Sequence, residues 1–190
     1  MIIAVEGIDG AGKTSVSKKL SEKLGFTFIE KALKNAFSIN KDVYISLRES
    51  LKSYAKEKPD VMAMFFLLNN AVCNVSAENI IADRYLMTNY FFYGNEKNKL
   101  LYTAFLEVMG KPNYTVVLTA DNDTLKKRIK SRGLSKAEEE KELRKVNQNI
   151  RFDDKVVPFL EECGLKYIVI DTSNLSADET TEIILNKLII

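Results

Sequence analysis

The segment that most restricts the fold of this chain is Gly7 to Thr14, which reads Gly-Ile-Asp-Gly-Ala-Gly-Lys-Thr. It satisfies the pattern G-x-x-x-x-G-K-[ST], in which a glycine-rich loop wraps around phosphate groups. The pattern is informative only between a strand and a helix. Here an apolar run, Met1 to Val5, precedes it, and an amphipathic helix is predicted over Ser15 to Leu24. These residues therefore predict a strand, loop and helix unit that binds a phosphorylated ligand.

Each residue type in this loop has a physical task. Glycines let backbone N–H groups converge on an anion, and the following helix adds the positive end of its dipole. Lys13 can reach the β- and γ-phosphates of a nucleotide, and the Thr14 hydroxyl can bind Mg²⁺. A tight glycine turn without a nucleotide is the alternative. The residues predicted to hold the nucleotide are Gly7, Gly10, Ala11, Gly12, Lys13, Thr14 and Ser15.

Short apolar segments alternate with helical periodicity along the rest of the sequence. This alternation is typical of a parallel sheet with helices on both faces, because crossovers between parallel strands run through helices. No linker or repeat divides the chain, so we expect one three-layer α/β domain over residues 1–190. Five strands are predicted: Met1 to Val5, Phe26 to Glu30, Asn79 to Ala82, Tyr114 to Thr119 and Tyr167 to Ile170.

Helices are predicted between these strands from periodicity and from Pro and Gly signals. Pro59-Asp60 separates two of them and gives the second an N-cap signal. Residues 31–42 are polar and support no assignment. The remaining helices are expected over Val43 to Lys56, Val61 to Val75, a region from about Leu86, Asp121 to Arg132, Lys136 to Phe159 and Ala177 to Leu188.

Composition excludes several kinds of function. The chain has no histidine, which excludes Ser-His-Asp and Cys-His catalysis and metal sites built on imidazole. Its net charge of +2 is too small for a general nucleic-acid-binding protein. No apolar stretch approaches the length of a membrane span, and Cys73 and Cys163 form no disulfide framework. We therefore expect a cytoplasmic protein whose partners include neither nucleic acid nor a membrane.

The strand predicted at residues 79–82 ends in Asp83-Arg84, which bears on what happens to the phosphate. Asp83 can hold Mg²⁺, and Arg84 can clamp an acceptor phosphate with its planar fork. This pair suits phosphoryl transfer to a small acceptor. A GTPase would carry an Asn-Lys-x-Asp segment, which Asn40-Lys41-Asp42 does not match, and an ATP-driven motor commonly has Asp-Glu here. The remaining alternative is an ion pair at the strand end.

A second pair of arginines, Arg128 and Arg132, lies near the end of the helix predicted before Gly133. Their i,i+4 spacing predicts that both guanidinium groups lie on one helix face. Beside a short segment at about residues 133–145, they suit a lid that closes over the donor nucleotide and supplies positive charge. The alternatives are two cations at a helix C-terminus and, for Lys136 to Lys145, a solvated helix face.

With these motifs in place, the sequence resembles the thymidylate kinase family over nearly its whole length. Ala4 to Thr14 is similar to the family's phosphate-binding loop with its internal aspartate, and Asp83-Arg84-Tyr85 is similar to its Asp-Arg-Tyr signature. The resemblance implies a P-loop fold of five parallel strands with a short lid. It also implies a homodimer and Mg²⁺-dependent phosphate transfer from ATP to a deoxynucleoside monophosphate, foremost dTMP. Further similar segments are Thr88 to Gly94, Leu118-Thr119, Leu125 to Gly133 and Ile170 to Thr172.

The resemblance also implies roles for individual residues. Asp9 would contact the sugar 3′-hydroxyl of the acceptor or organise its phosphate. Phe66 would stack on the acceptor base, and Phe92 would crowd the sugar 2′ position and so favour deoxyribose. Thr14 and Asp83 would hold Mg²⁺. The implied catalytic residues are Asp9, Lys13, Arg84 and Arg132, with Arg128 and Arg132 also binding the donor. The implied acceptor site comprises Asp9, Lys31, Phe66, Asn70, Arg84, Thr88, Asn89, Phe92 and Tyr93.

Three positions depart from the family's pattern. Asn70 stands where an arginine usually reads a thymine oxygen, and Lys31 stands where an acceptor-phosphate arginine is usual. Lysine keeps the charge and loses the bidentate geometry. The lid offers Lys136 without a clear arginine match, so Lys136, Arg128 or Arg132 would supply its charge. The identity of the base therefore stays open.

These departures leave other functions in competition. One is a related kinase for a different deoxynucleotide or for an unphosphorylated nucleoside. A nucleoside would need a general base for its hydroxyl proton, for which Glu6 and Glu30 are the candidates. The other is a nucleotide-binding module with impaired transfer.

Overall fold

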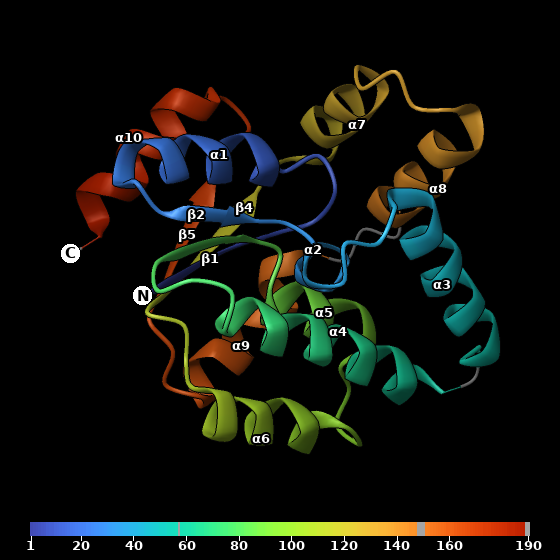
Figure 1. Cartoon of the computed structure of the whole chain (residues 1–190). Coiled ribbons are helices and arrows are strands. Elements are labelled where there is room, and N and C mark those ends of the chain that lie inside the picture. The colour runs from blue at the N-terminus through green and yellow to red at the C-terminus, as the bar shows by residue number, and fades with distance from the viewer. Residues whose placement is uncertain (57, 148–150, 189–190) are drawn as a thin grey trace.

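The computed structural model describes residues 1–56, 58–147 and 151–188, and its centre is a five-stranded parallel sheet (Figure 1). The strand order is β2-β3-β1-β4-β5. The predicted fold class and all predicted strands are confirmed, with ends displaced by no more than one residue. The strands are β1 (Ile2–Glu6), β2 (Thr27–Ile29), β3 (Ile80–Asp83), β4 (Tyr114–Thr119) and β5 (Tyr167–Asp171).

Helices cover both faces of the sheet, which is why its central strands are apolar along their length. Every residue of β1 and β4 after the first is buried. One face carries α1 (Lys13–Leu24) and α10 (Ala177–Lys187) (Figure 1). The other carries α4 (Pro59–Asn74), α5 (Leu86–Tyr93), α6 (Lys99–Met109) and α9 (Phe152–Glu162).

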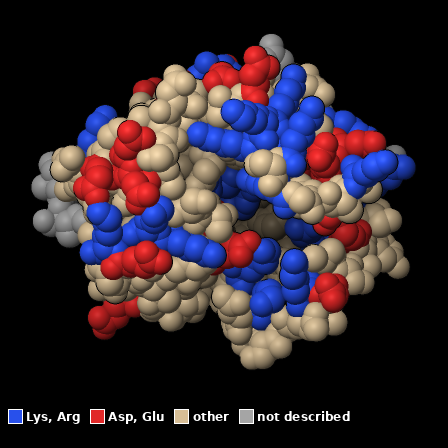
Figure 2. All heavy atoms as spheres, turned by 90° about the horizontal axis from the view of Figure 1, so that it is seen from above, with Lys and Arg blue, Asp and Glu red and all other residues tan. Residues whose placement is uncertain are grey.

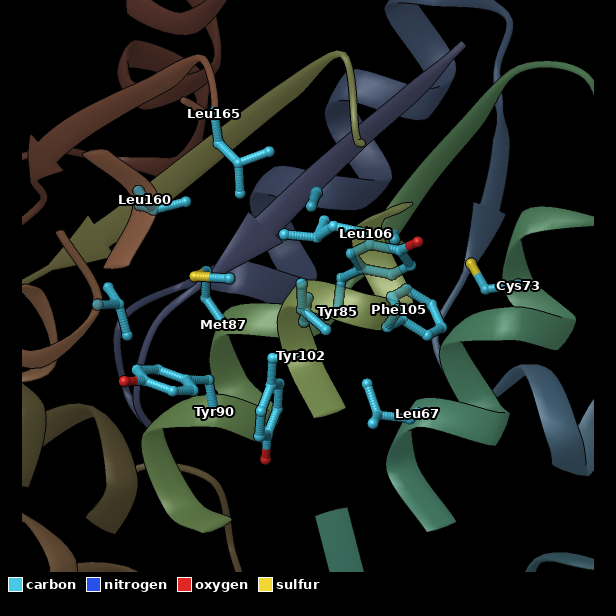
Figure 3. Packing of buried hydrophobic residues seen from close by; sticks show 14 of the residues in the cluster. Leu67, Cys73, Tyr85, Met87, Tyr90, Tyr102, Phe105, Leu106, Leu160 and Leu165 are labelled. Carbon is cyan, nitrogen blue, oxygen red and sulfur yellow. The ribbon is translucent and has the colours of Figure 1, made fainter. Parts of the chain in front are cut away.

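The core between the sheet and α4, α5, α6 and α9 is rich in aromatic rings (Figure 3). Tyr90 stacks on Phe159 with 4.1 Å between ring centroids and meets Tyr102 edge-on at 5.0 Å. Tyr102 is fully buried, and its hydroxyl donates to Asn89 Oδ1 at 3.2 Å. These contacts fix α5, so the residues at its two ends have defined positions.

The other helices lie toward the carboxyl ends of the strands (Figure 1), and the observed helix boundaries correct three expectations. Pro59 is the first residue of α4, with Lys58 at the N-cap position, because proline fits the first helical turn. The helix expected to reach Arg132 ends at Lys130, so Arg132 lies in the next loop and not on a shared helix face with Arg128. These helices are α2 (Ala32–Ala36), α3 (Lys41–Tyr54), α7 (Asn122–Lys130) and α8 (Lys136–Asn147).

The third expectation is the helix predicted over Lys136 to Phe159, which corresponds to α8 and α9. Residues 148–150 between them lie outside the described residues. Among the helices that the structure describes, none is both long and apolar enough to cross a membrane. Cys73 and Cys163 are free. The cytoplasmic location and the extent of the lid stay predictions.

Candidate active site

The phosphate-binding loop lies at the carboxyl edge of the sheet, between β1 and α1. The pairing of β1 with β3 places Val5 opposite Asp83, so the loop and Asp83-Arg84 leave the sheet side by side. Gly7 cannot carry a side chain, because its φ is +147° and a Cβ atom would lie 2.4 Å from the Leu118 carbonyl oxygen. Gly12 caps the start of α1. Ligands of open parallel sheets bind at this edge.

Lys13 is the buried cation of this loop. Its side chain is almost inaccessible, and Nζ donates to the Ile8 carbonyl oxygen. Burial and the nearby Arg84 charge lower the pKa of Lys13 to about 7, while Asp9 and Asp83 oppose this shift. A phosphate beside Lys13 would favour its protonated form, because a neighbouring negative charge stabilises the ammonium.

Thr14 and Asp83 come together as the sequence predicts for a Mg²⁺ site. Thr14 Oγ1 donates to Asp83 Oδ2 at 2.5 Å. Asp83 is buried, and its Oδ1 has no hydrogen-bond partner among the described residues. Such an oxygen is costly unless a ligand satisfies it. Protein Mg²⁺ sites often use one or two carboxylates with substrate phosphates, so Thr14 and Asp83 fit an ion shared with a nucleotide.

The Asp9 carboxylate forms ion pairs with two residues, Arg84 after β3 and Lys145 of α8. Arg84 donates from Nη2 to Asp9 Oδ1, and Lys145 donates from Nζ to Oδ2 at 2.8 Å. Burial opposes the charge of Asp9, but Arg84, Lys13 and Lys145 outweigh it and hold its pKa well below the usual range. Arg84 has a φ of +71°, a left-handed conformation uncommon for a residue with a side chain. Strain of this kind clusters at functional sites.

The helix α8 brings Lys145 to the phosphate-binding loop. At the start of α8, Ser135 Oγ accepts from Glu138 N at 3.4 Å, and Glu138 Oε2 accepts from Ser135 N at 3.2 Å. Arg132 donates from Nη1 to Glu142 Oε2 at 3.0 Å, and its charge contributes to the lowered pKa of Lys13. Lys136, the lid cation considered from the sequence, is exposed at the start of α8.

Arg128 is engaged by oxygen atoms of the loop framework. Its guanidinium donates to the Thr172 carbonyl at 2.6 Å and to Thr172 Oγ1 at 2.9 Å, with longer contacts to the Leu175 and Gly10 carbonyls at 3.3 and 3.4 Å. Thr172 Oγ1 also lies 3.0 Å from the Thr119 carbonyl. Arg128 therefore connects α7, the phosphate-binding loop and the segment after β5. Its predicted contact with a donor nucleotide stays a prediction.

A cluster of aromatic side chains, here called the aromatic group, lies on the other side of the site and comprises Phe66, Phe92 and Tyr93. Phe66 and Tyr93 are half-buried and stack on each other, with 5.5 Å between centroids and 19° between planes. Phe92 is half-buried, and the Lys145 ammonium lies 5.0 Å from its ring centroid. Of the four consecutive aromatics at residues 90–93, Tyr90 is buried in the core, and Phe91 and Tyr93 are half-buried and pack against it.

Two residues predicted to contact the acceptor, Thr88 and Asn89, are buried and committed to the protein's own contacts. Glu6 accepts bonds from Met87 N at 2.7 Å, Thr88 N at 3.0 Å and Thr88 Oγ1 at 2.5 Å. Burial raises the pKa of Glu6, which these bonds oppose. Asn89 Nδ2 donates to the Ala63 carbonyl at 3.0 Å. Thr88 and Asn89 therefore hold the protein's own framework, and both carboxylate oxygens of Glu6 already accept hydrogen bonds from it.

The two departures from the family pattern have different surroundings. Lys31 pairs with Glu30 and lines a cavity of about 500 Å³ with Lys34 and Lys41. Asn70 is buried on α4, and its Nδ2 donor has no hydrogen-bond partner in the part of the chain that the structure describes. An unsatisfied buried donor of this kind is a place where a ligand acceptor atom would be stabilising.

Seven charged residues influence one another around the loop, and cations outnumber anions among them. Figure 2 shows Lys and Arg side chains gathered around a hollow on this face of the molecule. Burial and the neighbouring Asp9 raise the pKa of Glu142. The positive excess favours a phosphorylated ligand. The cations are Lys13, Arg84, Arg132 and Lys145, and the anions are Asp9, Asp83 and Glu142.

Comparison with known proteins agrees with this geometry. A family model described as thymidylate kinase matches residues 5–183. The chain is 28% identical to a deoxyguanosine kinase of Bacillus subtilis, a match that covers 69% of this chain and 66% of that protein. It is also 28% identical to a probable thymidylate kinase of Methanocaldococcus jannaschii, over 94% of this chain and 90% of that protein.

Solved structures show the same fold. The chain superimposes on a deoxyadenosine kinase from M. mycoides with bound dATP at a TM-score of 0.64, with 23% sequence identity and 98% of each chain covered. At this identity the likeness bears on the fold. The match to the family model, in contrast, runs through the phosphate-binding loop, Asp83-Arg84 and α8.

Proposed function

This chain belongs to the thymidylate kinase family, and from that premise we propose that it transfers the γ-phosphoryl group of ATP to a deoxynucleoside monophosphate. It is a phosphotransferase of the nucleoside and nucleotide kinase type. We propose ATP as the donor, a deoxynucleoside monophosphate as the acceptor and Mg²⁺ as the metal ion.

The observation that carries the proposal is the meeting of Arg84 and Lys145 on Asp9, between the phosphate-binding loop and the aromatic group. Transfer between two phosphates needs positive charge between donor and acceptor and a site from which water is excluded. The strained backbone of Arg84 directs a planar guanidinium to this place. A helix from the lid supplies the second cation.

The remaining residues would bind either the donor phosphates or the metal ion. Lys13 and the loop N–H groups would bind the donor phosphates, and Arg132 would add charge from the lid. Thr14 and Asp83 would hold Mg²⁺, which would supply positive charge against the negative charge of the phosphates. The protein forms no covalent intermediate in this scheme, so catalysis rests on positioning and preorganised charge.

The acceptor base would lie against Phe66 and Tyr93 of the aromatic group. The free Nδ2 donor of Asn70 supports a role in reading a base acceptor atom, such as a carbonyl oxygen. Asparagine is shorter than the arginine usual in the family and carries no charge, so the accepted base can differ from thymine. We propose dTMP as the first acceptor to test, with the other deoxynucleotides beside it.

A second candidate is phosphorylation of an unphosphorylated deoxynucleoside. Glu30 at the carboxyl end of β2 favours it, because such an acceptor needs a base for its hydroxyl proton. Glu30 is 43% exposed and pairs with Lys31, so a carboxylate is available at this edge of the sheet. The similarity to a deoxyguanosine kinase supports the same candidate.

One experiment separates these possibilities: ADP formation from ATP and Mg²⁺ over deoxynucleoside monophosphates, ribonucleoside monophosphates and free nucleosides. The proposal expects the highest kcat/KM with a deoxynucleoside monophosphate. Turnover confined to free nucleosides would establish the second candidate. ATP binding without turnover of any acceptor would leave a nucleotide-binding module. Lys13→Met serves as the control for contaminating kinases.

We also propose that the protein is a homodimer, as the family resemblance implies. Exposed apolar side chains on α4 and α6, two helices that contact each other, support this proposal, because apolar side chains gathered on one surface mark interaction sites. Analytical ultracentrifugation tests it, and a monomer at micromolar concentration would reject it. These side chains are Met64, Leu68 and Val75 at α4 and Leu100 and Val108 on α6.

A further inference from the structure

Lys145 contacts two different parts of the site at once. Its Nζ atom donates to Asp9 Oδ2 at 2.8 Å and lies 5.0 Å from the Phe92 ring centroid. Asp9 belongs to the phosphate-binding loop, whereas Phe92 lies on α5 among the aromatic rings. One ammonium group therefore joins the polar and the aromatic ends of the site.

The position between these two ends corresponds to the sugar of a nucleotide acceptor. Its phosphate belongs with Arg84, facing the donor phosphates at Lys13, and its base belongs with Phe66 and Tyr93. The sugar connects phosphate to base, so it must lie between the cations and the rings. Lys145 bridges this interval.

Neighbouring lysine and arginine residues on α8 do not share this position. Lys141 precedes Lys145 by one helical turn and contacts Glu49 of α3 at 3.3 Å. Arg144 is 78% exposed and pairs only weakly with Glu140 at 3.6 Å. The three residues carry the same charge on the same helix, so they separate a local effect of Lys145 from a general effect of α8.

We propose that Lys145 is a positioning residue for sugar selection, which holds Asp9 and Phe92 in place against the sugar of the acceptor. The inference rests on the proposed function, because it assumes a nucleotide acceptor in this site. The fixed Phe92 ring presents an apolar surface to the sugar, and a 2′-hydroxyl placed against it would lose its water without gaining a partner. Lys145 limits the movement of this ring and fixes the side chain of Asp9 in the phosphate-binding loop.

Lys145→Met tests the proposal, because methionine keeps most of the aliphatic stem and removes the ammonium group. The preference for deoxyribose over ribose is expected to fall by about fivefold or more, the size of one cation–π contact. Lys145→Arg restores much of the preference, since it retains the positive charge. Lys141→Met and Arg144→Met each remove one charge from α8 and leave the preference unchanged.

The readout is the ratio of dissociation constants for a deoxynucleotide and its ribose counterpart, measured by calorimetry with a non-hydrolysable ATP analogue present. The pair is the monophosphate with the fastest turnover, or the thymine pair if none turns over. Absence of turnover in the wild type contradicts the proposed function alone. An unchanged ratio in Lys145→Met, or an equal fall in Lys141→Met, overturns the role of Lys145. A wild type that binds both sugars equally, or neither, overturns it as well.

Discussion

Replacing Arg128 with methionine is expected to destabilise the protein before any nucleotide binds. The guanidinium makes two short hydrogen bonds to Thr172, at 2.6 and 2.9 Å, and two longer contacts at 3.3 and 3.4 Å. Thr172 is buried between β4 and the phosphate-binding loop. Methionine retains the apolar stem and removes every donor, so the substitution isolates the hydrogen bonds.

The magnitude follows from the two short bonds. A hydrogen bond from a charged donor contributes about 1.5 to 3 kcal/mol, and the lower value applies because Arg128 is half-buried and water can replace it in part. Two such bonds give a loss of about 3 kcal/mol in the free energy of unfolding. For a chain of this length, that loss lowers Tm by roughly 6 to 12 °C.

Urea unfolding followed by circular dichroism, without nucleotide, measures this loss. Arg132→Met is the matched control, because its ion pair with Glu142 is partly exposed and contributes about 1 kcal/mol or less. If the two variants unfold at the same urea concentration, the structural role of Arg128 is refuted. Its sequence-based assignment as a donor contact would then be the better account.

Three further predictions concern the site itself. Lys13→Met should lower kcat by about 10²-fold or more without changing the circular dichroism spectrum, because it removes a preorganised donor to the phosphates; an unchanged kcat would contradict the assignment of the loop. Asp83→Asn should raise the Mg²⁺ concentration for half-maximal activity by about tenfold to a hundredfold. The Kd for nucleotide without metal is the control. The same Mg²⁺ dependence in the wild type and the variant would exclude Asp83 as a ligand. Asn70→Ala should reduce kcat/KM for the acceptor by about tenfold while leaving the Kd for ATP unchanged, and equal kinetics for all acceptors would place Asn70 outside the base site.

The fold could be predicted well because its signals are local. A strand covered on both faces is a short continuous apolar run, and for this reason the sequence predicts both ends of Tyr114–Thr119. The phosphate-binding loop is also local, since its glycines, Lys13 and Thr14 are adjacent in sequence. Thr14 and Asp83 meet because the parallel strands β1 and β3 end at the same edge of the sheet.

Direction of side chains and long-range contacts could not be predicted in the same way. Lys145 lies in a charged run that reads as a solvated helix face, and only the path of α8 brings it to Asp9. Thr88 and Asn89 have the polarity of ligand contacts, but the buried Glu6 and the α4 backbone use their hydrogen bonds. The i,i+4 spacing predicts Arg132 on one helix face with Arg128, because spacing alone does not show that α7 ends at Lys130.

The cations of the site already converge on one place in the structure without a bound anion. Lys13, Arg84 and Lys145 converge around Asp9, and their mutual repulsion is offset in part by Asp9 itself. The offset is incomplete, because burial and Arg84 still lower the pKa of Lys13 to about 7. A phosphate group would relieve this repulsion and favour the protonated lysine. The same arrangement would stabilise charge that develops during transfer, since its cations need no reorganisation when the reaction occurs.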